Sequence, residues 1–342
     1  MSFHMMIRRS ILIGALFAMI GAPSPAPAAD TVKVAAISRT FFYLPLWIAV
    51  RQGFMKAEDL DVQIEILDNS DQVNAMLRTG EVRIVVRTTE AAMIDAYHGG
   101  NLRVIAGGIS KLPHFLIAQP RFKTLADLRG ANFGILAEKE GTTAIIKDIA
   151  KAAGLGPNDY KLSIVGGSPA RWRLLKEGKI DAGLQPIPNS YEAEDAGFSN
   201  LGAALNFAPD WQFTSVNVDR IWAEQNRSLV VRFLKGLQRG RDFMNSNPAE
   251  TAKIGAEELR TTVAMTTRML VDIEKYGMLD PQTALNVPGL RKVFDTLQAA
   301  GDIDAGRRFE LGVFADFSYW EQSHPNADPV VTGTIPAARP QR

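Results

Sequence analysis

The most informative absence in the 342-residue sequence is cysteine, which does not occur. A chain without thiols forms no disulfide, holds no thiolate-bound metal, uses no cysteine nucleophile and carries no cysteine-linked lipid. Histidine is scarce, with four residues, so we expect no metal site. The charges almost cancel, with 38 Lys and Arg against 37 Asp and Glu, so neither nucleic acid nor an anionic membrane is expected as the main partner.

Long hydrophobic runs are also missing, apart from one short run near the N-terminus. Ser10–Gly21 is mostly apolar, but it is shorter than the roughly 20 residues that span a membrane. Arg8 and Arg9 precede this run, and residues 22–28 after it are rich in Ala and Pro, an order typical of a secretory signal peptide. We expect cleavage near Ala28 and export to the periplasm, by either the general or the twin-arginine route.

The remaining sequence has the composition of a globular protein, with 46% hydrophobic and 22% charged residues. Strand-like and helix-like segments alternate from Thr31 onward; for example, Val62, Ile64 and Ile66 alternate with polar residues, as in a half-buried strand. After Asp219 the pattern becomes wholly helical. The alternation predicts an α/β fold with two lobes, each a mostly parallel sheet flanked by helices, followed by a helical C-terminal region.

Two short crossings, near Phe115 and Phe213, predict how the chain divides between the lobes. We expect lobe 1 to contain residues 30–117 and 216–323, including the C-terminal helices, and lobe 2 to contain residues 118–215. Residues 324–342 contain four prolines and are predicted to form a mobile tail. In such a clamshell the ligand cleft lies between the lobes, at the C-terminal ends of the strands.

Several segments match a known family in order and spacing. Tyr43–Leu46 reads Tyr-x-Pro-Leu and is followed by a Gly-Phe pair; further matches are Leu77–Val82, Thr124–Gly130, Ala152–Leu155 and Leu175–Ala182. With these segments the chain resembles periplasmic substrate-binding proteins of ABC importers, of the nitrate/sulfonate/taurine and thiamine-pyrimidine-precursor type. The resemblance implies the type 2 periplasmic-binding-protein fold, a small-molecule ligand, and delivery to a membrane permease with a cytoplasmic ATPase.

The resemblance also implies which loops hold the ligand. Carried over by position, the ligand-binding candidates are Thr40, Phe41, Phe42, Tyr43, Asn69, Ser70, Thr88, Thr89, Glu90, Phe115, Gly141, Thr142, Thr143, Gln185, Phe213 and Asn217.

Three of these groups each allow two interpretations. Phe41, Phe42 and Tyr43 form either an aromatic wall for a flat ligand or a hydrophobic staple that fixes a helix start. Gly141–Thr143 opens a helix whose N–H groups suit an anion, or it is an ordinary N-cap. Glu90 either favours a ligand with N–H groups or positive charge, or complements its own helix dipole.

The sequence therefore predicts binding without catalysis. The motifs G-x-S-x-G, H-E-x-x-H and G-x-x-x-x-G-K-[ST] are absent. We expect a monomeric, extracytoplasmic solute-binding component of an ABC import system, without a cofactor, that captures a sulfonate, carboxylate, pyrimidine or similar small organic molecule. Two alternatives stay open: a pyrimidine-precursor synthase-like enzyme of the same fold, whose cysteine-rich motif this chain lacks, and a binding protein for an inorganic anion such as nitrate.

Overall fold

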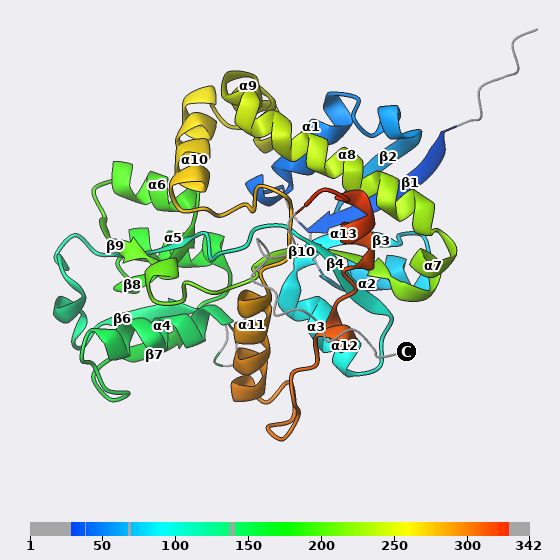
Figure 1. Cartoon of the computed structure of the whole chain (residues 1–342). Helices are drawn as coiled ribbons and strands as arrows, with labels where there is room; N and C mark the ends of the chain where they lie inside the picture. Colours follow the sequence, from blue (N-terminus) through cyan, green and yellow to red (C-terminus); the bar gives the residue numbers. More distant parts are fainter. Residues whose placement is uncertain (1–28, 38, 68–69, 137, 139–140, 328–342) are drawn as a thin grey trace, which may run out of the picture.

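The computed structural model describes residues 29–37, 39–67, 70–136, 138 and 141–327. The predicted signal peptide, Asn69 and residues 328–342 of the predicted tail lie outside this part of the chain. Figure 1 shows two α/β lobes side by side, with helices from the C-terminal third lying over and between them.

The first lobe is built on a five-stranded sheet with the order β2-β1-β3-β10-β4. Its strands are β1 (Asp30–Ile37), β2 (Leu60–Leu67), β3 (Ile84–Thr88), β4 (Leu102–Gly107) and β10 (Thr214–Asp219). β1 pairs in parallel with β2 and β3, whereas β10 pairs antiparallel with β3 and β4. The helices that connect its first strands are α1 (Leu44–Arg51), α2 (Ser70–Thr79) and α3 (Thr89–Tyr97).

The second lobe repeats this plan with the strand order β7-β6-β8-β5-β9. Its strands are β5 (His114–Ala118), β6 (Asn132–Ile135), β7 (Lys161–Ile164), β8 (Ala182–Pro186) and β9 (Ser199–Ala203). Its helices are α4 (Gly141–Ala152), α5 (Ser168–Lys176) and α6 (Asn189–Asp195). β6 pairs in parallel with β7 and β8, and β5 runs antiparallel to β8 and β9. The predicted fold class is confirmed. Each sheet is mixed, because the strand that follows a crossing, β5 or β10, runs antiparallel to its neighbours.

Both crossings join the lobes at the same edge of each sheet. β5 begins at His114, opposite Pro186 at the C-terminal end of β8, and β10 begins at Thr214, opposite Thr88 at the C-terminal end of β3. The predicted lobe boundaries at residues 117/118 and 215/216 fall inside these two strands. Because each strand belongs wholly to one sheet, each crossing lies a few residues earlier in the chain than predicted. This topology places the ends of the parallel strands of both lobes around one junction.

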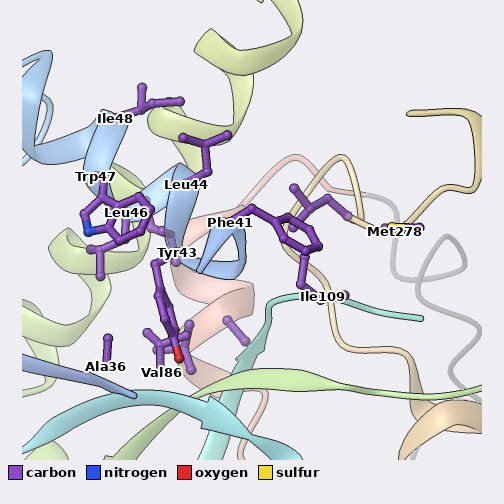
Figure 2. Close-up of a cluster of buried hydrophobic side chains, with 14 of the residues drawn as sticks. Ala36, Phe41, Tyr43, Leu44, Leu46, Trp47, Ile48, Val86, Ile109 and Met278 are labelled. Atoms are coloured by element: carbon purple, nitrogen blue, oxygen red, sulfur yellow. The ribbon is translucent and has the colours of Figure 1, made fainter. Parts of the chain in front are cut away.

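A buried cluster fixes the start of α1 on the first sheet. α1 has a proline in its first turn, where the missing N–H costs nothing, and Leu46, Trp47 and Ile48 are buried along it. Figure 2 shows the Tyr43 and Trp47 side chains between this helix and the sheet residues. Burial of each large apolar side chain contributes about 2 kcal/mol, so the segment that leads into the junction is anchored.

The C-terminal third is helical, as predicted. It contains α7 (Arg220–Gln225), α8 (Arg227–Ser246), α9 (Pro248–Leu259), α10 (Val263–Lys275), α11 (Val287–Ala300), α12 (Leu311–Phe314) and α13 (Ser318–Ser323). Short 3-10 turns elsewhere are η1 (Phe41–Tyr43), η2 (Lys56–Glu58), η3 (Leu125–Leu128) and η4 (Ala204–Asn206). α8 and α9 pack on α1, α10 lies beside α9, and α11 contacts both α3 and α4 (Figure 1). The C-terminal helices therefore connect the two lobes.

One further property concerns membranes. Within the described residues, no helix combines the length and apolarity needed to cross a bilayer.

Candidate functional site

An aromatic cluster marks the junction of the lobes. The Phe42 ring meets the Phe213 ring edge-on with centroids 5.1 Å apart, and the His114 ring meets Phe213 at 5.4 Å. Phe42 comes from η1 after β1, Phe213 precedes β10, and His114 begins β5. Phe42 and Phe213 are half-buried, so part of the surface of each side chain stays accessible at the crossings.

The two rings beside Phe42 lie in the protein interior. Phe41 is 1% exposed and lies against Ile109 and Met278 (Figure 2). Tyr43 is 3% exposed; its Oη donates to Ile37 O at 2.8 Å and accepts from Ile37 N at 3.1 Å. Burial raises the pKa of Tyr43 to about 12, so it stays a neutral phenol. These two rings fix the end of β1 and hold Phe42 in place.

The start of α3 is tied to the return crossing. Thr89 N donates to Phe213 O at 3.0 Å, and the buried Thr89 Oγ1 hydrogen-bonds Ser215 Oγ at 3.1 Å. Thr88, the N-cap residue, makes no side-chain capping bond. The backbone bond places the first turn of α3, with Glu90, next to the aromatic cluster.

Glu90 also reaches the second lobe. A Cβ atom on Gly141 would lie 3.0 Å from Glu90 Oε1 and 3.1 Å from Trp211 Cζ2. Gly141 is the first residue of α4, so the carboxylate from the first lobe lies at the N-terminus of a helix in the second lobe. The absence of a side chain at Gly141 permits this close approach of the lobes.

The α4 start is otherwise polar and buried. Thr143 is fully buried and Thr142 is half-buried. The first turn of α4 has no acidic residue of its own. The Glu90 carboxylate of the other lobe lies close to this helix N-terminus, where negative charge is favourable.

Three other predicted candidates, Phe115, Gln185 and Asn217, make contacts with other parts of the protein scaffold. The Phe115 ring contacts Tyr276 at a centroid distance of 5.7 Å. With its amide oriented to satisfy both groups, Gln185 donates to the Ser168 carbonyl at 3.3 Å and accepts from the Trp172 amide.

Asn217 likewise serves the first sheet. Its Nδ2 donates to the Val85 and Ser215 carbonyls at 3.3 and 2.9 Å, and its Oδ1 accepts from Ser215 Oγ. Of the remaining predicted residues, Thr40 is half-buried beside η1, and the Asn69 residue and the Ser70 side chain lie outside the described part of the chain.

Two further buried residues lie at the junction and are not among the predicted ligand contacts: sequence reasoning did not consider Trp211 and interpreted His114 as a structural residue. Trp211 is fully buried, and its Nε1 has no hydrogen-bond partner; His114 is also buried and its Nδ1 has no partner. Burial, and secondarily the positive charge of Arg171, lowers the pKa of His114 to about 3, so the imidazole is neutral at neutral pH. Trp211 stands two residues before the predicted Phe213, and this closeness was the available signal.

A separate cavity lies within the first lobe. It has a volume of about 1010 Å³ and is lined by α2, α3 and α7, including Arg87, Asp95 and Trp222. The aromatic cluster and Gly141 do not line it, so it is distinct from the junction. In the described part of the chain, no group of three His, Cys, Asp or Glu side chains could hold a metal ion.

Comparison with solved structures defines the class of fold. The periplasmic aliphatic sulphonate-binding protein SsuA of Escherichia coli superposes with a TM-score of 0.66 at 12% identity, covering 84% of this chain and 92% of that one. The chain therefore has the periplasmic-binding-protein fold.

The family follows from the sequence comparison. Residues 41–251 match the NMT1/THI5-like family model, and the chain belongs to that family, which confirms the resemblance. A protein of Brucella abortus named as a binding protein is 25% identical over 64% of this chain and 68% of its own length. A 4-amino-5-hydroxymethyl-2-methylpyrimidine phosphate synthase of Candida albicans is 23% identical over 61% of this chain and 65% of its own length. The relatives thus include a binding protein and an enzyme.

Proposed function

We propose that this protein is the solute-binding component of an ABC import system. It is exported to the periplasm, acts as a monomer, captures a small organic molecule between its lobes and delivers it to a permease with a cytoplasmic ATPase. The observation that supports this most strongly is at the junction of the lobes, where Phe42 contacts Phe213 and the start of α3, bonded to Phe213, brings Glu90 close to the start of α4.

The proposed mechanism is a ligand-driven change in the balance between open and closed forms. A solute that contacts both lobes favours the closed form by its higher affinity for that form. The close approach of Glu90 and Gly141 is the kind of contact that forms on closure. The permease would then distinguish loaded from empty protein by shape.

One enzymatic candidate is supported by a specific finding, the similarity to the Candida albicans synthase. The enzymatic alternative is less favoured, because the family resemblance implies a cysteine-rich motif for such synthases and this chain has no cysteine. Binding of a simple inorganic anion is also less favoured, because a carboxylate already lies at the α4 N-terminus.

The test is thermal unfolding of the purified protein against a solute panel, with native mass spectrometry of the same sample. A solute at 100 times its Kd stabilises the folded protein by about 2.7 kcal/mol. We expect one chemical class to raise the melting temperature and to appear as an intact non-covalent complex. Conversion of the solute to a product of different mass would instead indicate an enzyme.

A further inference from the structure

The cavity within the first lobe contains a buried arginine. Arg87 lies in β3 and is 4% exposed, and it lines the cavity. Val85, two residues earlier on the same face of the strand, belongs to a buried cluster with Val73 of α2 and Met93 of α3. The Arg87 side chain therefore enters the space between the sheet and these two helices.

The protein provides few partners for the Arg87 guanidinium. Its Nη1 donates to Asn74 Oδ1 at 3.0 Å, whereas its buried Nε has no acceptor. Within the described residues, no ion pair joins Arg87 to a carboxylate. Burial lowers the pKa of Arg87, and the more distant Asp95 carboxylate opposes this effect, but arginine keeps its charge at neutral pH. A buried cation with so little compensation is unfavourable, and an anion that hydrogen-bonds it would offset that cost.

The two aspartates that line the cavity are already bound by other donors. Asp219 Oδ2 accepts from Arg83 Nη1 at 2.9 Å, and its Oδ1 caps α7. Asp95 Oδ2 accepts from Leu102 N at 2.9 Å. Arg78 adds a further positive charge to the lining. With three arginines against two aspartates, the lining favours an anion over a cation.

Apolar side chains form much of the remaining cavity wall. They are Leu77, Ala91, Ile94, Leu102, Ile221 and Trp222. Trp222 is half-buried and Ile221 is 47% exposed, so both present apolar surface. The volume of about 1010 Å³ is comparable to that of small-molecule sites, which combine apolar walls with a few polar groups. A solute with an apolar body and one anionic end matches this distribution.

We propose that this cavity is a second solute site, which binds an organic anion with a carboxylate or sulfonate head at Arg87 and an apolar body against Trp222 and Ile94. A guanidinium holds the oxygens of such a head by charge-assisted hydrogen bonds. The site is separate from the junction of the lobes, because Phe42 and Phe213 do not line it. The inference is independent of the proposed function, since binding within one lobe requires no closure.

Calorimetry with 3-phenylpropionate and 3-phenylpropanamide tests the proposal, because the two probes share a ring and a chain but differ in the charge of the head. Both are measured on the wild-type protein and on Arg87→Gln. The matched control is Arg308→Gln, because Arg308 is exposed and lies outside the cavity. We expect the wild-type protein to bind 3-phenylpropionate about tenfold more tightly than the amide. Arg87→Gln should remove this preference by weakening 3-phenylpropionate about tenfold, whereas Arg308→Gln should match the wild type.

A second variant tests the apolar wall and does not depend on the folding of Arg87→Gln. Trp222→Leu should weaken 3-phenylpropionate severalfold, because it removes aromatic contact area from the cavity. Inorganic phosphate, which has no apolar body, should bind the wild-type protein more weakly than 3-phenylpropionate. Circular dichroism and thermal unfolding establish that each unliganded variant is folded.

Four results would overturn the proposal. They are an absence of 3-phenylpropionate binding to the wild type, equal or tighter binding of the amide, phosphate binding as tight as that of 3-phenylpropionate, and an affinity that stays unchanged in Arg87→Gln and Trp222→Leu. If Phe42→Ala weakened 3-phenylpropionate in that last case, the probe would be placed at the junction instead. Solute capture in the panel experiment would still support the import function if this second site failed.

Discussion

At the residue scale, the neighbouring rings of η1 have different roles. Phe42 is half-buried and contacts Phe213, whereas Tyr43 is buried and bonds both backbone atoms of Ile37. The sequence predicted an aromatic group at this position. It could not predict which ring faces the junction, because the orientation of a short 3-10 turn depends on the surfaces that pack around it.

This difference predicts contrasting substitutions. Phe42→Ala should leave the fold nearly as stable but weaken solute binding about tenfold, because it removes exposed contact area at the junction. Tyr43→Ala should lower the free energy of unfolding by about 3 kcal/mol, because it leaves a cavity in the core. Urea unfolding and calorimetry on both variants measure the two effects. Similar loss of stability in both would contradict the assignment of Phe42 to the ligand surface.

The lowered pKa of His114 predicts how the stability of the protein depends on pH. Its folded-state pKa of about 3 lies below the ordinary value of 6.5, so the unfolded chain takes up a proton first as the pH falls. Its contribution to stability is therefore present at neutral pH and is lost progressively between about pH 6.5 and pH 3.

Between pH 7 and pH 5 the contribution of His114 to the free energy of unfolding falls by about 2 kcal/mol. His114→Gln should remove that part of the pH dependence, as measured by urea unfolding at the two pH values. His98→Gln is the control, because His98 is exposed on the first lobe. An unchanged pH slope in His114→Gln would show that folding does not lower the pKa of His114.

At the element scale, the start of α4 sets how closely the lobes approach. Gly141→Ala would place a methyl group 3.0 Å from Glu90 Oε1 and 3.1 Å from Trp211 Cζ2. We expect this crowding to weaken solute binding at least about tenfold, because it opposes closure while leaving each lobe intact. Gly154→Ala would not be a suitable control, because Gly154 has a positive φ of 72°. Gly312→Ala is suitable, since nothing lies within 4 Å of its Cβ position.

The pair α6 and α10 forms a second contact between the lobes. Tyr191 Oη donates to Asp272 Oδ2 at 2.6 Å, and the Arg268 guanidinium lies 4.1 Å from the centre of the Tyr191 ring and pairs with Glu194. α10 packs on α9, which packs on α1 and α8 of the first lobe. These bonds therefore stabilise the arrangement of the lobes described here.

Tyr191→Phe removes the hydrogen bond and keeps the ring. We expect a loss of about 1 kcal/mol in the stability of the closed form and a corresponding severalfold faster release of solute. Stopped-flow dissociation measures the release rate. An unchanged rate would indicate that the α6–α10 contact forms equally in open and closed protein.

At the scale of the whole molecule, the alternating pattern was sufficient to predict the two lobes and the helical C-terminal region. Hydrophobic periodicity indicates which face of each helix or strand is buried, and it depends only on residues close together in the sequence. The contact between Glu90 and Gly141 joins residues far apart in the sequence and in different lobes, so no local pattern reveals it. Gln185 and Asn217 were predicted as ligand contacts by their position in the family; in the structure their amides bond the backbone of the scaffold, and such long-range bonds leave no local pattern in the sequence.

The lack of native cysteine allows a direct measurement of closure, because two introduced cysteines are the only labelling sites. Lys56→Cys in η2 and Lys151→Cys in α4 place spin labels at exposed positions, one on each lobe. Pulsed electron paramagnetic resonance then gives the distribution of distances between the labels, with and without each solute of the panel. We expect one solute class to change the distribution to a narrower, shorter-distance population. A distribution that stays the same with every solute would contradict solute capture by closure of the two lobes.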